Sequence, residues 1–183
     1  MKKLLFPLFL LLVFLASCSS KKEIPVLNED TVTLSTEFFG ASVYYVYGYS
    51  FEQSKKVTVS FPDTRQVADI VPSRLQQPDG SVIGAQFSTM GNNPNGFNLK
   101  GSFSTLQEAT DFYHSLTTVE DTTWNNPTDM LAPFQVYVFK TYKENFVKFM
   151  VTNVNIVNTG TPSENYVEIE ITYFIQRDGS PNV

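Results

Sequence analysis

Apolar and polar residues alternate along much of the chain, with the period of two that is typical of β-strands with one buried face. The clearest alternating runs cover residues 42–51, 55–61, 82–88, 134–142, 146–157 and 166–176. A weaker run covers residues 67–75 and is interrupted by Pro72. Short polar connections at 52–54 and 143–145 each join two runs, so we expect antiparallel hairpins there.

One segment, residues 104–116, has helical periodicity instead. Ser104 or Thr105 can cap its first turn, with Gln107 or Glu108 three residues further on, as in a capping box. The apolar residues that recur at helical spacing are Leu106, Ala109, Tyr113 and Leu116. We therefore predict one amphipathic helix of about three turns.

These patterns predict an all-β fold of about eight strands with this one helix, as a mainly antiparallel sandwich or rolled sheet. Aromatic residues favour strands, and the chain holds 16 Phe and 9 Tyr among its 183 residues. Residues 31–183 have a usual length for one domain and can bury a core without disulfides. We expect a single β-rich domain over residues 31–183.

The chain begins differently, with two lysines and then an apolar run from Leu4 to Ala16. As a helix this run is about 20 Å long, too short for a hydrocarbon core of about 30 Å, so it is typical of an export signal. It ends in Leu-Ala-Ser-Cys, the small residues and cysteine of a lipobox. We predict a signal peptide over residues 1–17, a diacylglycerol and palmitate anchor on Cys18, and a polar tether over residues 18–30.

Cys18 is the only cysteine, so we favour lipidation over an ordinary secretory signal with an incidental thiol. The same count excludes a disulfide framework. No Asp follows Cys18, so retention at the inner membrane is not indicated. We expect a domain held by its lipid at the outer membrane, facing the periplasm or the cell surface.

Charge and motifs exclude several classes of protein. The formal net charge is −5 and Lys and Arg are not clustered, which argues against nucleic-acid binding. No nucleophile elbow, phosphate loop, zinc spacing or dinucleotide fingerprint is present, and His114 is the only histidine. The acidic pairs are explained by solvation; they are Glu29 with Asp30, Glu120 with Asp121, and Glu168 with Glu170. We predict no catalytic residue, no metal site and therefore no enzyme.

Four side chains are candidates for ligand contact: Met90, His114, Trp124 and Met130. Trp124, in a polar loop, can meet a ligand or fold back over the core. His114 falls on the polar side of the predicted helix, where a solvated residue and a ligand contact are both open. Met90 and Met130 can coordinate a soft metal or heme iron, or fill gaps in the core.

A ladder of aromatic side chains shares one face of the run 42–51, and consists of Tyr45, Tyr47, Tyr49 and Phe51. It is either the buried face of a core strand or a stacking surface for a flat ligand such as a porphyrin or a sugar ring. Because another regular strand follows directly, we favour the core.

Two C-terminal segments carry a family resemblance. Residues 135–149 read Gln-Val-Tyr-Val-Phe-Lys-Thr-Tyr-Lys-Glu-Asn-Phe-Val-Lys-Phe, and residues 167–179 read Val-Glu-Ile-Glu-Ile-Thr-Tyr-Phe-Ile-Gln-Arg-Asp-Gly. Together with the lipobox and tether, they resemble the HmuY-like family of Bacteroidetes heme-binding lipoproteins. A looser similarity covers residues 47–57 and 68–70. The resemblance implies a lipid-anchored β fold that binds a ligand without converting it, with heme as the named candidate.

The resemblance leaves the ligand open. It implies heme ligation by two histidines, and this chain has His114 alone, so bis-histidine ligation within one chain is excluded. Mixed ligation by His114, Met90 or Met130 stays open, as does the absence of heme. The alternative function is a structural or interaction subunit of an outer-membrane or adhesive assembly, with a protein partner.

Overall fold

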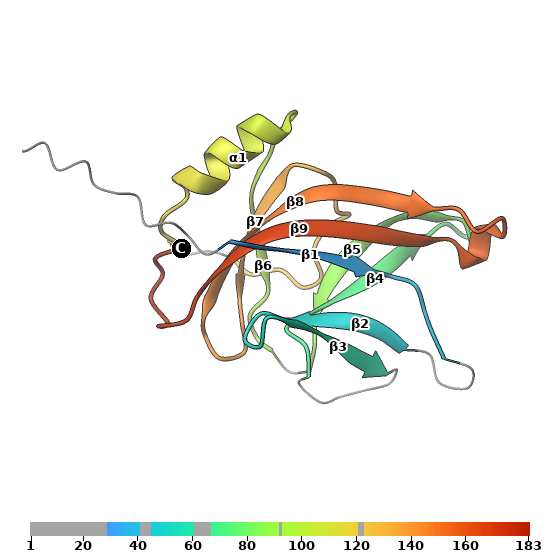
Figure 1. Ribbon diagram of the computed structural model, residues 1–183, viewed down its shortest axis with the longest axis horizontal. Helices are drawn as coiled ribbons and strands as arrows, with labels where there is room; N and C mark the ends of the chain where they lie inside the picture. Colours follow the sequence, from blue (N-terminus) through green and yellow to red (C-terminus); the bar gives the residue numbers. More distant parts are fainter. Residues whose placement is uncertain (1–28, 41–44, 61–66, 92, 121–122) are drawn as a thin grey trace, which may run out of the picture.

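The computed structural model describes residues 29–40, 45–60, 67–91, 93–120 and 123–183, and within them the chain forms two antiparallel sheets (Figure 1). The five-stranded sheet has the order β1-β9-β8-β7-β6, with bounds β1 Asp30–Ser35, β6 Phe97–Ser102, β7 Gln135–Lys140, β8 Phe146–Val157 and β9 Tyr166–Gln176. The four-stranded sheet has the order β3-β2-β4-β5, with bounds β2 Tyr45–Ser50, β3 Lys55–Ser60, β4 Ile70–Gln76 and β5 Val82–Thr89. The expected all-β sandwich is confirmed.

The space between the sheets is filled largely by aromatic rings from both of them. Phe51, directly after β2, lies 5.0 Å from Tyr173 of β9, and Phe87 of β5 lies 6.0 Å from Phe149 of β8, as distances between ring centroids. The hydroxyl groups of Tyr49 and Tyr173 are hydrogen bonded at 2.6 Å across the same space. Rings of this size bury large apolar areas, and their edge-to-face contacts add to that gain.

One segment, residues 125–131, closes one side of the sandwich by bonding to an edge strand of each sheet. The backbone amide of Asn125 donates to the carbonyl of Phe97 in β6, and Phe97 donates back, both at 2.8 Å. The amides of Thr128 and Leu131 then donate to carbonyls of β5 at 2.9 and 2.8 Å. This segment therefore covers edges whose unpaired backbone groups would otherwise be available to other chains.

The single α-helix of the described residues, α1 (Leu106–Ser115), packs on the outer face of the five-stranded sheet over β7 and β8. Thr105 caps it by accepting from the amide of Glu108, and the Glu108 side chain accepts from the amide of Thr105, so the capping box is confirmed. Ala109 and Tyr113 are buried as expected. Leu106, in the first turn of α1, is exposed.

Most strand predictions are confirmed, and β8 and β9 have the predicted bounds. Two strands were not predicted: β1, which starts at Asp30 inside the expected tether, and β6. The predicted break at Pro72 is wrong, because β4 runs from Ile70 to Gln76 without interruption. β4 pairs with β2 only at Ile70, so the missing amide hydrogen of Pro72 costs no ladder bond on that side.

The aromatic ladder of β2 divides between core and surface. Tyr49 and the following Phe51 are buried between the sheets, as the core interpretation predicts. Tyr47 is 45% exposed and stacks on Phe39 with ring centroids 4.6 Å apart, and Tyr45 lies on the other flank of Phe39. The sheets thus enclose only the second half of the ladder.

The tyrosine pair at the centre of the sandwich gives a test of the core. In Tyr49→Phe, the Tyr173 hydroxyl keeps a partner, because it also donates to Asp30 at 3.2 Å. In Tyr173→Phe, the buried Tyr49 hydroxyl keeps no partner. We expect a loss of about 1 kcal/mol for Tyr49→Phe and about 2 kcal/mol for Tyr173→Phe in urea unfolding. Equal losses, or the reverse order, would contradict this account.

Candidate functional site

The structure places the candidate side chains on different faces of the sandwich. His114 and Trp124 lie on the outer face of the five-stranded sheet, on α1 and in the loop that follows it. Met90 and Met130 belong to the four-stranded sheet and the closing segment. Cys18, the signal segment 1–17 and residues 18–28 of the expected tether lie outside the described residues.

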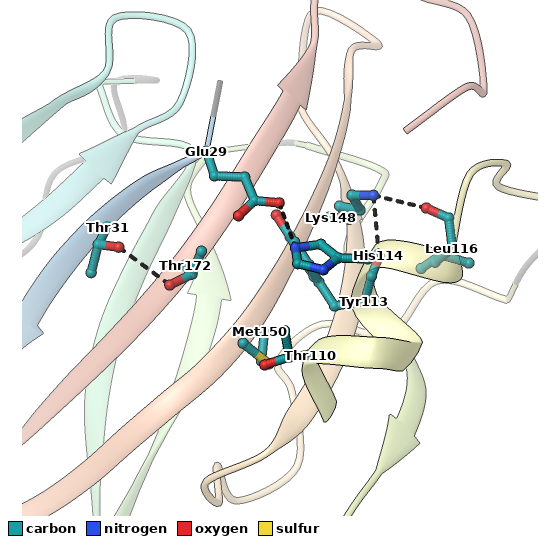
Figure 2. A network of polar contacts seen from close by, with 9 residues as sticks. All are labelled: Glu29, Thr31, Thr110, Tyr113, His114, Leu116, Lys148, Met150 and Thr172. Atoms are coloured by element: carbon teal, nitrogen blue, oxygen red, sulfur yellow. Dashed lines mark hydrogen bonds and ion pairs between the residues drawn. The ribbon is translucent and has the colours of Figure 1, made fainter. Parts of the chain in front are cut away.

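His114 lies on the solvent side of α1, with 52% of its side chain exposed. Its Nε2 atom is 3.1 Å from Oε1 of Glu29, the residue directly before β1 (Figure 2). The contact joins the helix to the start of the described chain. His114 therefore contacts the first described residue of the chain, and it lines none of the three cavities described below.

Beneath α1 lies a buried cation that the sequence analysis missed. Lys148 of β8 is fully buried, and its Nζ donates to the carbonyls of Tyr113 at 3.2 Å and Leu116 at 2.9 Å (Figure 2). These carbonyls belong to the C-terminal end of α1, where they have no partner within the helix and where the helix dipole favours a positive charge. The ammonium group also lies 4.8 Å from the Tyr113 ring centroid.

Burial sets the electrostatics of this cluster. It lowers the pKa of Lys148 from 10.5 to about 8, and the charge of Glu29 acts in the opposite direction. The Tyr113 hydroxyl is buried without a hydrogen-bond partner, and burial raises its pKa above the ordinary value. The cluster holds α1 and the first described residues against the sheet. Since its amine is enclosed, we assign it a structural role.

The methionines occupy two separate places on the other sheet. Met90 is buried in a small cluster on the outer face of the four-stranded sheet, and it lines a cleft of about 200 Å³ together with Val59, Val71 and Ser73. Met130 is 51% exposed and lies over Gly84 of β5. Met90 therefore packs in a small core that borders a cleft, and Met130 covers a strand.

Trp124 lines the largest of the three cavities found, about 600 Å³, on the outer face of the five-stranded sheet. The cavity is lined by Val119, Glu120, Trp124, Lys140, Glu144, Phe146, Gly179 and Pro181. The indole is half-buried, with its ring centroid 6.4 Å from that of Phe146. It thus packs on the sheet and borders open space, so both interpretations of Trp124 hold in part.

One ion pair borders this cavity. Nζ of Lys140 is 3.3 Å from Oε2 of Glu144 and 5.6 Å from the ring centroid of Phe146. The Glu144 carboxylate therefore has an ammonium group as a neighbour.

A buried carboxyl group, that of Asp69, lies near the β2–β3 and β7–β8 turns. Asp69 is fully buried; its Oδ2 accepts from the Glu52 amide at 3.4 Å, and its Oδ1 has no partner. Burial raises the pKa of Asp69 to about 6. The Glu52 carboxylate accepts from Asn145 and Thr141 of the β7–β8 turn at 2.9 and 2.8 Å. This network docks one hairpin on the other.

None of the three cavities is lined by more than one of the four candidate residues. Heme iron needs an axial His, Met, Cys or Tyr beside an apolar slot. The Trp124 cavity has none of these ligands among its lining residues, and its rim is charged. Among the described residues, no group of three or more His, Cys, Asp or Glu side chains is placed to hold a metal ion. The Trp124 cavity therefore does not fit heme. Of His114, Met90 and Met130, only Met90 lines one of these three cavities, the cleft of about 200 Å³ on the other sheet.

Fold and site together define a two-sheet β-sandwich with a cavity on one outer face that is lined by two aromatic rings, two carboxylates and one ammonium group. No protein-family model matches this chain, and no curated protein sequence matches it. The HmuY-like resemblance therefore stays a prediction. In the described part of the chain, no helix has the length and apolar character needed to cross a membrane.

The buried amine of Lys148 predicts the direction in which the free energy of unfolding changes with pH. Between pH 8 and 10.5 the unfolded chain binds more protons at Lys148 than the folded chain, so the free energy of unfolding should rise with pH across this window, by about 2 kcal/mol. Lys148→Met should remove that rise. Lys143→Met, at an exposed position in the same hairpin, should retain it. Urea titrations at several pH values measure both; equal slopes in the two variants would contradict burial of the Lys148 charge.

Proposed function

We propose that this protein is a lipid-anchored, extracytoplasmic binding protein of HmuY-like type that holds a ligand in the Trp124 cavity without converting it. The observation that carries this proposal is the cavity itself. It is the largest of the three found, and its walls combine two aromatic rings with two carboxylates and an ammonium group. Ligand sites usually join apolar surface to a few polar groups in this way.

The proposed lipid anchor on Cys18 is inferred from the lipobox. Cys18 follows a short apolar run and small residues, and it is the only thiol in the chain. Glu29, eleven residues after Cys18, already contacts α1. A lipid on Cys18 would therefore hold the domain close to a membrane surface.

The second candidate function is an interaction subunit, and a separate surface favours it. Four aromatic rings gather where the strands β1 and β2 leave the sandwich: Phe38, Phe39, Tyr45 and Tyr47. Phe38 and Tyr47 are exposed, and Arg74 lies 5.2 Å from the Phe38 ring centroid. Exposed aromatic groups with a nearby arginine are enriched in protein interfaces.

The anchor is tested by metabolic labelling with radioactive palmitate in a bacterial host. The native chain should be labelled and recovered with the membrane fraction, because the Cys18 thiol is the only site for the thioether. Cys18→Ser should lose the label and leave the membrane fraction. An unlabelled native chain would contradict the anchor, whatever the cavity binds.

The cavity is tested by quenching of tryptophan fluorescence, since Trp124 is the only tryptophan in the chain. Acrylamide quenching of the purified protein should fall when a small-molecule filtrate of the source bacterium is added, because a ligand would cover the indole. Tyr142→Ala, an exposed residue of the same hairpin that does not line the cavity, serves as the control and should behave as the native chain does.

Two further experiments separate the alternatives. A stoichiometric protein partner that co-purifies with the native chain after mild detergent extraction, and is lost in Tyr47→Ala, would favour the interaction subunit. Hemin would support heme binding only if it gave a shifted Soret band that His114→Ala, or Met90→Leu with Met130→Leu, removes. Because these residues lie apart, we expect no such band.

A further inference from the structure

We infer that a second cavity, beside the closing segment of residues 125–131, binds a small organic cation: a primary ammonium group on an apolar body, with the Asp129 carboxylate as its counter-ion. We name it the Asp129 cavity. Its volume is about 310 Å³, and it shares no lining residue with the Trp124 cavity. The inference therefore goes beyond the proposed function and does not depend on it.

The closing segment is held to both sheets before any ligand binds. Oδ1 of Asn126 accepts from the Thr89 amide at 3.0 Å, and its Nδ2 donates to the Thr89 hydroxyl at 2.6 Å. The Thr128 hydroxyl accepts from an amide of β5 at 3.0 Å. A side chain in place of Gly96 would collide with the carbonyl of Asn125, so glycine permits this close approach to β6. Walls fixed in this way lose little conformational freedom when a ligand binds.

The same bonds show which polar side chains of the closing segment are left for a ligand. Those of Asn126 and Thr128 are used on β5. Those of Asn125 and Asp129 also belong to lining residues, and neither forms a hydrogen bond or ion pair with another described residue. The amide of Asn125 offers one oxygen acceptor, and the carboxylate offers two. An ammonium group has three N–H donors and can donate to both side chains at once.

The charge of the cavity selects the charge of its ligand. Asp129 is the only charged residue among those that line it, so a cation is attracted and an anion repelled. One carboxylate is too few for a metal ion such as Ca²⁺, which takes about six to eight oxygen ligands. An organic cation needs only one counter-ion, because the rest of its surface can contact apolar side chains.

The apolar part of the cavity suits a short hydrocarbon or aromatic body. Leu99 of β6 is 41% exposed and lies opposite Tyr137 of β7 in the sheet. Both residues line the cavity, together with Phe97 and Pro127. The volume is at the lower end of the range for ligand pockets, roughly 300–1,000 Å³. A cation also gains energy beside an aromatic ring. These features fit an amine of about the size of benzylamine.

The test is a titration of the isotope-labelled mature protein in mild detergent, followed through the NMR signals of the Leu99 and Asp129 amides. The probes are alike in size and differ in charge: benzylamine is a cation at pH 7, benzyl alcohol is neutral, and benzoate is an anion. We expect benzylamine to bind about tenfold more tightly than benzyl alcohol, and benzoate not to bind.

Asp129→Asn should weaken the binding of benzylamine about tenfold and leave that of benzyl alcohol unchanged, because only the ionic contact is removed. Asp111→Asn makes the same change in charge at an exposed position of α1 and is the matched control. The NMR spectrum of each variant shows that it is folded. The inference is overturned if benzylamine does not bind, if benzyl alcohol or benzoate binds as tightly, or if Asp111→Asn weakens binding as much as Asp129→Asn. Each of these results leaves the Trp124 cavity to its own quenching test.

Discussion

The ammonium group of Lys148, buried between the five-stranded sheet and the end of α1, fixes the parts of the molecule that surround the cavity. Its two hydrogen bonds hold the carbonyls of Tyr113 and Leu116 against β8. A buried charge is costly unless it is compensated, and here the compensation comes from a helix terminus whose carbonyls also need partners. Each group satisfies the other, so neither the helix end nor the lysine can move alone.

The docking of α1 also positions the chain segments that contact it on either side. His114, one residue beyond Tyr113, contacts Glu29 and so fixes where the chain enters the domain. In the other direction, Leu116 packs both with the residues under α1 and with those under Trp124. The segment after it then pairs with the C-terminal residues, which form one wall of the cavity. The cavity therefore depends on the same contact that docks the helix.

The sequence pattern predicts the fold but not the residues that surround Trp124, and the reasons are physical. Strands with four or five buried residues on one face, such as β9, show their period clearly. The edge strands β1 and β6 bury only one or two side chains, so their alternation is too short to separate from a polar loop. Trp124 was found as a candidate because it is a single large ring in a polar segment.

The residues around Trp124 were not found, because each of them reads as a surface position within its own segment. Glu120 follows a helix and Glu144 lies in a hairpin turn, and solvation explains both when they are taken alone. Lys148 likewise occupies the outer face of an amphipathic strand, where a lysine usually meets water. Only the docking of α1 converts that position into an interior one. Sites assembled from distant segments carry no local pattern.

The position of the cavity also bears on where its ligand would be met. From Cys18 to Glu29 the chain can span at most about 40 Å. Figure 1 places the start of β1 beside the C-terminus, and the C-terminal segment lines the cavity. If the lipid holds Cys18 in a membrane, the cavity lies at the tethered end of the sandwich, and the exposed aromatic group of Tyr47 lies on the other sheet. A ligand of the cavity would then be met near the membrane surface, whereas a protein partner would meet the second sheet.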